Sequence, residues 1–145
     1  MINAFSSSEV SKITGISCRQ LAYWDSTGLL KPSVRSASGK GSRRLYSPRD
    51  LVELKIIVKM LGISVSLQRL RSSLRFIKAL PDPLADLIVI TDGETIYLCK
   101  DKELVLDTIK HGQVILRIEV VDLISEVERK VNELNATKVN DAVAF

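Results

Sequence analysis

The spacing of apolar and polar side chains near the start of the chain predicts a short helix. Ser6 precedes Glu9 by the interval of a capping box, in which each side chain bonds the backbone N–H of the other residue. Val10 and Ile13 then give one apolar face, and Gly15 supplies the left-handed residue that commonly ends a helix. We therefore predict a helix that begins after Ser6 and ends at Gly15.

A second short helix is predicted directly after this turn. Ser17 and Gln20 repeat the capping interval, Leu21 and Trp24 share a face, and Gly28 follows. Two short helices joined by a tight glycine turn are typical of a helix-turn-helix. Leu21 and Trp24 should then be buried against the first helix.

The next segment predicts a hairpin and two longer helices. Residues 33–35 and 43–46 can pair as strands around a glycine-rich, cationic tip, which forms a wing. A helix should follow Ser47, with Pro48 in its first position, and another should follow Ser64. The predicted buried stripes are Leu51, Leu54, Val58 and Leu61 in the first of these helices, and Leu67, Leu70, Leu74 and Ile77 in the second.

Pro81 and Pro83 interrupt this helical pattern and predict a boundary. The segments that follow read as strand, strand, helix, strand and helix, at residues 87–90, 95–99, 101–112, 113–121 and 120–135. The fold class predicted is α+β, with a winged helix-turn-helix over 1–80, a small ββαβα domain over 81–135 and a flexible tail over 136–145.

Charge separates the two predicted domains more clearly than composition does. Residues 1–80 carry 14 Lys and Arg against 4 Asp and Glu, a net charge of +10, whereas residues 81–145 carry 7 against 13, a net charge of −6. A basic excess of this size favours a polyanionic partner such as nucleic acid, although a solvated basic surface would give the same count.

The helix-turn-helix gives this charge a specific use. The second helix of such a motif presents its N-terminal residues to base edges, where Arg bonds guanine and Gln bonds adenine, so Arg19 and Gln20 are candidate base contacts. Lys40, Arg43 and Arg44 on the wing are candidate contacts to phosphates or a minor groove. The alternative is that these are ordinary surface residues.

The joined pattern of "TGIS", "YWDSTGLLKP", "RRLYSPRD" and "LGISV" resembles the winged helix-turn-helix domain of MerR-type transcriptional regulators, over residues 5 to 75. The resemblance implies a homodimer that binds a near-palindromic promoter element in double-stranded DNA and often bends and untwists it for RNA polymerase. It implies that Ser17, Arg19, Gln20 and Tyr23 face the DNA, and that Arg43, Arg44 and Tyr46 contact its backbone.

The sequence departs from the family pattern in three places. Ala22 stands where many members have Arg, and the wing is longer and more basic than usual. Pro81 and Pro83 occur where well-known members continue into a long coiled-coil helix, so residues 81–145 are not matched to the usual sensor domains.

The last predicted helix carries apolar residues at heptad spacing. They form either a dimer seam, which we prefer because the family is dimeric, or a face packed on the strands. The candidate seam residues are Val120, Ile124, Val127, Val131 and Leu134.

No pattern in the sequence points to a cofactor, a metal site or an enzyme. Cys18, Cys99 and His111 are too scattered to form a ligand set, and Cys99 reads as a small buried residue. The acids Asp86, Asp92 and Glu94 surround a predicted turn, where they are expected for conformational reasons.

Two functional classes are therefore carried forward. The first is a site-specific transcription regulator. The second is an architectural, nucleoid-associated protein or antitoxin-like adaptor whose acidic half binds another protein. With no apolar run long enough to span a bilayer and no secretion signal, we expect a cytoplasmic protein without membrane contact.

Overall fold

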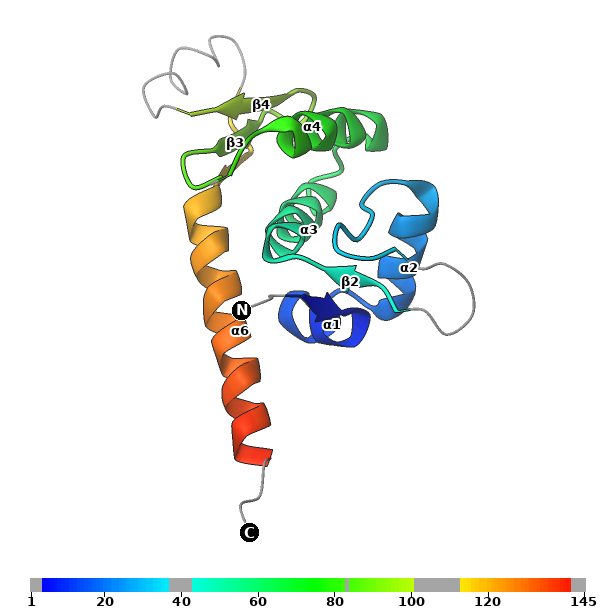
Figure 1. The fold of residues 1–145 in the computed structure, drawn as a ribbon. Helices are drawn as coiled ribbons and strands as arrows, with labels where there is room; N and C mark the ends of the chain where they lie inside the picture. The colour runs from blue at the N-terminus through cyan, green and yellow to red at the C-terminus, as the bar shows by residue number, and fades with distance from the viewer. Residues whose placement is uncertain (1–3, 37–42, 83, 101–112, 142–145) are drawn as a thin grey trace. The chain divides into compact units, whose positions relative to one another are not determined.

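The computed structural model describes residues 4–36, 43–82, 84–100 and 113–141 (Figure 1). Helices occur together with small antiparallel sheets, in runs rather than in alternation, which confirms the α+β class. The helices are α1 (Ser7–Thr14), α2 (Cys18–Thr27), α3 (Pro48–Leu61), α4 (Leu67–Ala79) and α6 (Val120–Asp141). The strands are β1 (Phe5–Ser6), β2 (Leu45–Tyr46), β3 (Ile88–Thr91), β4 (Ile96–Cys99) and β5 (Leu116–Glu119).

The chain forms two compact units that are not continuous in sequence. Residues 1–54 and 125–145 belong to one unit, and residues 55–124 belong to the other. The division therefore falls inside α3 and inside α6 rather than at Pro81 and Pro83, where the sequence predicts a boundary. A single helix can contribute residues to both compact units. The sequence pattern shows where a helix ends but not where one unit ends and the other begins.

The capping residues of α1 and α2 are those that the sequence predicts. Ser6 Oγ accepts the Glu9 N–H at 3.3 Å, and Glu9 Oε1 accepts the Ser6 N–H at 3.1 Å, which completes the capping box. Ser17 Oγ accepts the Gln20 N–H at 3.1 Å. Gly15 ends α1 with φ of 79°, a left-handed conformation that only glycine adopts without strain.

A short strand that the pattern does not predict, β1, precedes α1. β1 pairs antiparallel with β2, so that Phe5 lies opposite Tyr46 and Ser6 lies opposite Leu45. Phe5 and Tyr46 are both buried. A strand of this length shows no period, which is why the sequence gives no signal for it.

The predicted buried stripe of α3 is wrong in its second half. Leu51 and Leu54 are buried as expected, but Val58 and Leu61 are 40% and 42% exposed. The buried residues on the remainder of α3 are instead Ile56, Ile57 and Met60. Apolar residues occur nearly all round this helix, so the period does not select a unique face.

The start of α4 also differs from the prediction. The N-cap is Ser66, whose Oγ accepts the Arg69 N–H at 3.2 Å, and not Ser64, which has a left-handed φ of 60°. Leu67 is 48% exposed, whereas the other predicted core residues of α4, Leu70, Leu74 and Ile77, are buried. Because α4 starts two residues later than predicted, Leu67 is its first residue and lies outside the buried face formed by Leu70, Leu74 and Ile77.

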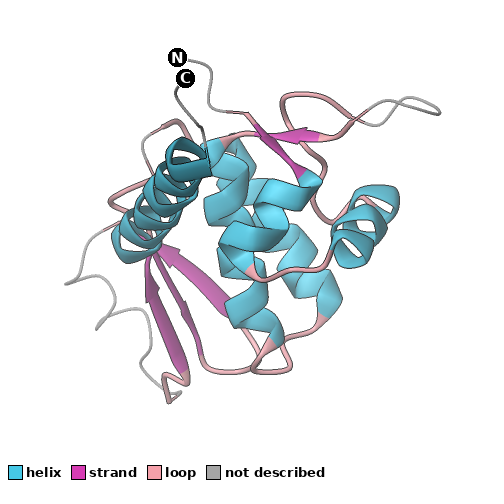
Figure 2. Ribbon diagram, turned by 90° about the horizontal axis from the view of Figure 1, so that it is seen from below, coloured by secondary structure: helices cyan, strands magenta, loops and turns pink. Residues whose placement is uncertain are grey.

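The second unit contains a three-stranded antiparallel sheet in the order β4-β3-β5, whose strands lie side by side in Figure 2. Val89 lies opposite Leu98 on β4 and Ile118 on β5, so these three side chains share one face. Ile88 and Ile90 lie on the other face with Cys99, which is buried as predicted. The three strands and the last helix follow one another along the chain as predicted, while the helix predicted at 101–112 lies outside the described residues.

Helix α6 follows β5 without a loop. The Val120 N–H donates to the Leu87 carbonyl at 3.0 Å, which joins the helix start to the residue before β3. The helix continues to Asp141, beyond residue 135, where the sequence predicts the flexible tail to begin. No glycine or proline occurs in this stretch to end it. Among the described helices, none combines the length and the apolar composition that crossing a bilayer requires.

Candidate nucleic-acid interface

The turn between α1 and α2 is held by the side chain of Thr14. Its Oγ1 donates to the Val10 carbonyl at 2.8 Å and accepts the Ile16 N–H at 3.2 Å. Thr14 and Ile16 are both buried. Because the turn is bonded and packed, the direction in which α2 leaves it is fixed by the first helix.

Helix α2 has one buried face and one exposed face at its N-terminal end. Leu21 and Trp24 are buried, as predicted, at 1% and 5% exposure. Arg19 is exposed, Gln20 is half-buried and Tyr23 is 61% exposed. Long polar side chains are thus presented together where a recognition helix would meet base edges.

Ser17 and Cys18 stand at the beginning of this exposed face. The Ser17 hydroxyl accepts the Gln20 N–H, and its own O–H hydrogen remains available for donation. Cys18 is an exposed free thiol in the first position of α2. The sequence predicts no role for Cys18, because it is too far from Cys99 and His111 to form a ligand set with them.

The base of the predicted wing is present in the structure. Arg35 and Leu45 form an antiparallel bridge, with the Leu45 N–H donating to the Arg35 carbonyl at 2.9 Å. The Arg35 Nε donates to the Arg43 carbonyl, also at 2.9 Å. Arg43 is exposed. The wing tip, including Lys40, lies outside the described residues.

Arg44 is held by a buried carboxylate. Its Nε lies 2.6 Å from Asp25 Oδ2, and the side chains of Arg44 and Asp25 are 28% and 9% exposed. Lys31 Nζ lies 3.4 Å from Asp25 Oδ1 and also donates to the Asp25 carbonyl at 3.1 Å. Asp25 therefore ties the end of α2 to the wing, a role that sequence spacing does not reveal.

A second buried carboxylate, Asp50, fixes the other end of the hairpin. Its Oδ2 accepts the Ser33 N–H at 2.8 Å, the Ser33 hydroxyl at 2.7 Å and the Ser47 N–H at 2.9 Å. Ser47 Oγ in turn accepts the Asp50 N–H at 3.1 Å, so the two residues form a capping box for α3. The wing base is thus bonded to the start of α3.

Tyr46 does not occupy the position that the family resemblance implies. Its side chain is fully buried, and burial raises its pKa to about 12, an effect partly offset by the nearby Arg44 guanidinium. A side chain with no exposed surface has no face to offer a DNA backbone. Tyr46 is a core residue beside Phe5, and we correct its expected role accordingly.

The residues of the candidate dimer seam are partly covered within a single chain. Val120 and Val127 are buried, and Ile124, Val131 and Leu134 are half-buried. The exposed side of α6 is mostly polar and includes an Arg129–Glu133 ion pair of 3.6 Å, although Val121 is 44% exposed. The seam stays a prediction.

Among the acids around the hairpin turn, Asp92 stabilises the turn itself. Asp92 Oδ1 accepts the Thr95 N–H at 2.8 Å and the Glu94 N–H at 2.9 Å, and these bonds hold the pKa of Asp92 below its ordinary value of 3.8. The described residues contain no group of three His, Cys, Asp or Glu side chains suited to a metal ion. His111 lies outside them.

Comparison with known proteins decides between the possible helix-turn-helix families. Residues 5–77 match the family described as MerR HTH family regulatory protein. The chain belongs to the MerR family. This confirms the resemblance predicted from "YWDSTGLLKP" and "RRLYSPRD".

The alignments with individual relatives differ in length. An uncharacterized HTH-type transcriptional regulator of Mycobacterium tuberculosis is 38% identical over 117 residues, which are 80% of this chain and 52% of that protein. The HTH-type transcriptional regulator HmrR of Sinorhizobium medicae is 32% identical over 66 residues, 46% of this chain and 43% of that protein. A probable heavy metal-dependent transcriptional regulator of Haemophilus influenzae is 36% identical over 63 residues, 43% of this chain and 47% of that protein.

The chain thus spans about half the length of the mycobacterial relative. That alignment is longer than the 73 residues of the MerR family match and so takes in part of the second half of this MerR-family chain. The alignments with the other two relatives are shorter than that family match.

Proposed function

We propose that this MerR-family chain is a sequence-specific regulator of transcription that binds double-stranded DNA as a homodimer on a near-palindromic promoter element. The observation that carries the proposal is the division of α2 into two faces. Leu21 and Trp24 are buried, whereas Arg19 and Tyr23 are exposed and Gln20 is half-buried beside the fixed turn after α1.

In this proposal the N-terminal half of α2 reads bases in the major groove. Arg19 bonds guanine through its two-pronged guanidinium, and Gln20 bonds adenine through its amide. Ser17 donates its hydroxyl hydrogen to a phosphate, and Tyr23 contacts the backbone at the edge of the groove. These roles together fix both the register and the sequence preference of the protein on DNA.

The wing contributes positive charge rather than sequence recognition. Arg43 is exposed at the base of the hairpin, and Arg44 keeps part of its guanidinium at the surface while it pairs with Asp25. We propose that both contact phosphates, together with Lys40. Such contacts strengthen binding to every sequence and make it sensitive to salt.

The dimer is proposed to form through α6, and the bound DNA to be bent and untwisted so that RNA polymerase, or another protein that contacts residues 81–145, uses the promoter. A two-fold symmetric protein requires two half-sites about one helical turn apart. The protein would work in the cytoplasm, at the nucleoid. This is the chemistry of a regulator and not of an enzyme, because no bond is made or broken.

Variants separate the two kinds of contact. A duplex recovered by the protein from a random-sequence pool is compared with a scrambled duplex by fluorescence anisotropy at several salt concentrations. We expect Arg19→Ala to weaken binding to the recovered duplex by ~1–3 kcal/mol with little effect on the scrambled one. We expect Arg43→Ala to weaken binding to both and to reduce the salt slope by about one.

The matched control is Arg75→Ala, which removes an exposed arginine from α4. It should leave discrimination between the two duplexes unchanged. If Arg19→Ala weakens both duplexes equally, α2 does not read bases, and an architectural role replaces the site-specific one. If Arg43→Ala changes neither affinity nor salt slope, the wing does not contact phosphates.

A further inference from the structure

We propose that the second compact unit binds an anionic amphiphile, a small molecule with a carboxylate and an apolar chain, in the groove between α4 and β4. The groove has a volume of about 690 Å³, within the range typical of small-molecule sites. All of its lining residues belong to this unit.

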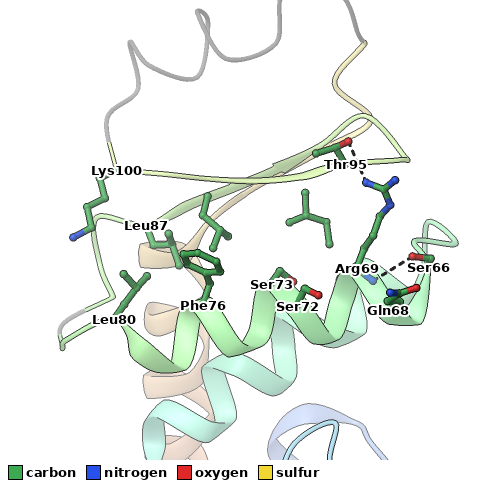
Figure 3. Close-up of a pocket in the computed structure, with 12 residues that line it drawn as sticks. Ser66, Gln68, Arg69, Ser72, Ser73, Phe76, Leu80, Leu87, Thr95 and Lys100 are labelled. Atoms are coloured by element: carbon green, nitrogen blue, oxygen red, sulfur yellow. Dashed lines mark hydrogen bonds between the residues drawn. The ribbon is translucent and has the colours of Figure 1, made fainter.

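The groove has an apolar interior with a polar wall. Figure 3 shows Phe76 pointing from α4 into the space beside Leu87, with Ser72 and Ser73 further along the same helix. Phe76 is 70% exposed although it stands in a concave site, and Ile96 and Leu98 line the sheet side. An apolar chain laid over this surface would remove it from water, which favours binding.

Charge determines which kind of apolar molecule fits. Arg69 and Lys100 lie at opposite ends of the groove in Figure 3, and the described residues that line it include no Asp or Glu. A cationic or neutral chain would gain nothing from these groups. A carboxylate would pair with the guanidinium in the two-pronged geometry that favours arginine.

The side chain of Arg69 is positioned before any ligand arrives. Its Nη1 donates to Thr95 Oγ1 at 3.3 Å, which engages one of the five N–H groups of the guanidinium. Thr95 is itself held by its N–H bond to Asp92 Oδ1 at 2.8 Å. Because the guanidinium is tethered at the groove edge, less side-chain entropy is lost when a carboxylate binds.

The order of charged and apolar groups gives the orientation of the ligand. The carboxylate is placed at the Arg69 guanidinium, which lies beside Thr95 at one end of the groove. The chain then runs past Ser73 toward Phe76 and Leu87. Lys100 adds positive charge at the far end.

The experiment is isothermal titration calorimetry of the full chain, without DNA, using decanoate as the probe and decyltrimethylammonium as a cation of equal chain length. We expect saturable binding of one decanoate per chain and none of the cation. Arg69→Gln should weaken decanoate binding about tenfold or more, since a charge-assisted bond is lost. Ser72→Trp should abolish it by filling the groove.

Arg75→Gln is the matched control, because it removes an exposed arginine of the same helix that does not line the groove. It should bind decanoate like the unmodified chain, and circular dichroism should show all three variants folded. The proposal is overturned if decanoate shows no saturable binding at concentrations below about 1 mM. It is equally overturned if Arg69→Gln and Arg75→Gln bind alike, or if the cation binds as well as decanoate.

Analytical ultracentrifugation of Ser72→Trp tests whether a second copy of the chain, rather than a small ligand, occupies the groove. If that substitution changes the oligomeric state of the chain, the groove is covered by a second copy, and the proposal of a small ligand is wrong. The titration needs no DNA, so its result is independent of whether α2 reads bases.

Discussion

Replacing Asp25 by alanine should destabilise the first compact unit and remove the ion pair that joins α2 to Arg44 of the wing. The carboxylate of Asp25 is 9% exposed and pairs with Arg44 at 2.6 Å and with Lys31 at 3.4 Å. Removal leaves Arg44, which is only 28% exposed, without its charge partner. Removing one member of a buried pair costs about 3–5 kcal/mol, and an exposed pair contributes about 0.2–1 kcal/mol.

The magnitude expected for Asp25→Ala lies between these limits. The Arg44 pair is partly solvated, so we assign it about 2 kcal/mol, in the range of a bond to a charged group. The Lys31 pair, with Lys31 62% exposed, adds at most about 0.5 kcal/mol. Alanine recovers about 0.5 kcal/mol, because it is a better helix former and removes a negative charge from the end of α2. The net loss is about 2 kcal/mol.

Urea unfolding followed by the fluorescence of Trp24, the single tryptophan of the chain, measures this loss. In a double-mutant cycle, Asp25→Ala and Arg44→Ala should show a coupling free energy of about 1–2 kcal/mol, and Lys31→Ala should cost less than about 1 kcal/mol. DNA binding by Asp25→Ala should weaken on all sequences alike. A coupling energy near zero, or a cost for Lys31→Ala equal to that for Asp25→Ala, would refute this reasoning.

Further predictions concern stability. Gly93→Ala should cost about 1–3 kcal/mol in urea unfolding, because φ is 96° and a residue with a Cβ is strained there. Gly62→Ala, where φ is not left-handed, should cost less, and equal losses would contradict the strain argument. Ser6→Ala should lower the unfolding free energy by about 1 kcal/mol by removing the α1 capping box, and an unchanged urea midpoint would show that the cap contributes nothing. The pKa of Tyr46, raised from 10.0 to about 12, means that the folded state retains its proton more tightly, so stability should hold below about pH 10 and fall as the pH rises toward 12. Tyr46→Phe should flatten this fall, and an identical pH profile for both proteins would count against the burial of Tyr46.

Local signals were sufficient to predict the helix ends of the first unit. A capping box and a left-handed glycine involve residues within one turn of each other, so Ser6, Gly15, Ser17 and Gly28 follow directly from spacing. The positions of the three strands in the second half could be predicted from local signals as well, because each is a short apolar run. The prediction that Leu21 and Trp24 are buried was also correct. Most other residues of α2 are polar, so the apolar face of this helix is easy to recognise in the sequence.

Features that depend on distant residues could not be predicted. The Asp25–Arg44 pair joins residues 19 apart in sequence, and Asp50 bonds Ser33 across 17 residues. The family resemblance implies a backbone contact for Tyr46, but pairing with β1 buries its side chain. The groove beside Arg69 exists only when α4 and β4 are packed, so no spacing reveals it.

Selection of duplexes from a random-sequence library, by the unmodified chain and by Arg19→Ala in parallel at physiological salt, tests the central claim most directly. Sequencing of the recovered pools gives the preferred motif of each protein. A dimer that reads bases through α2 should yield one inverted repeat, and the Arg19→Ala pool should lose preference at one base pair in each half-site. Broad recovery without a motif, or an identical motif from both proteins, would contradict the account.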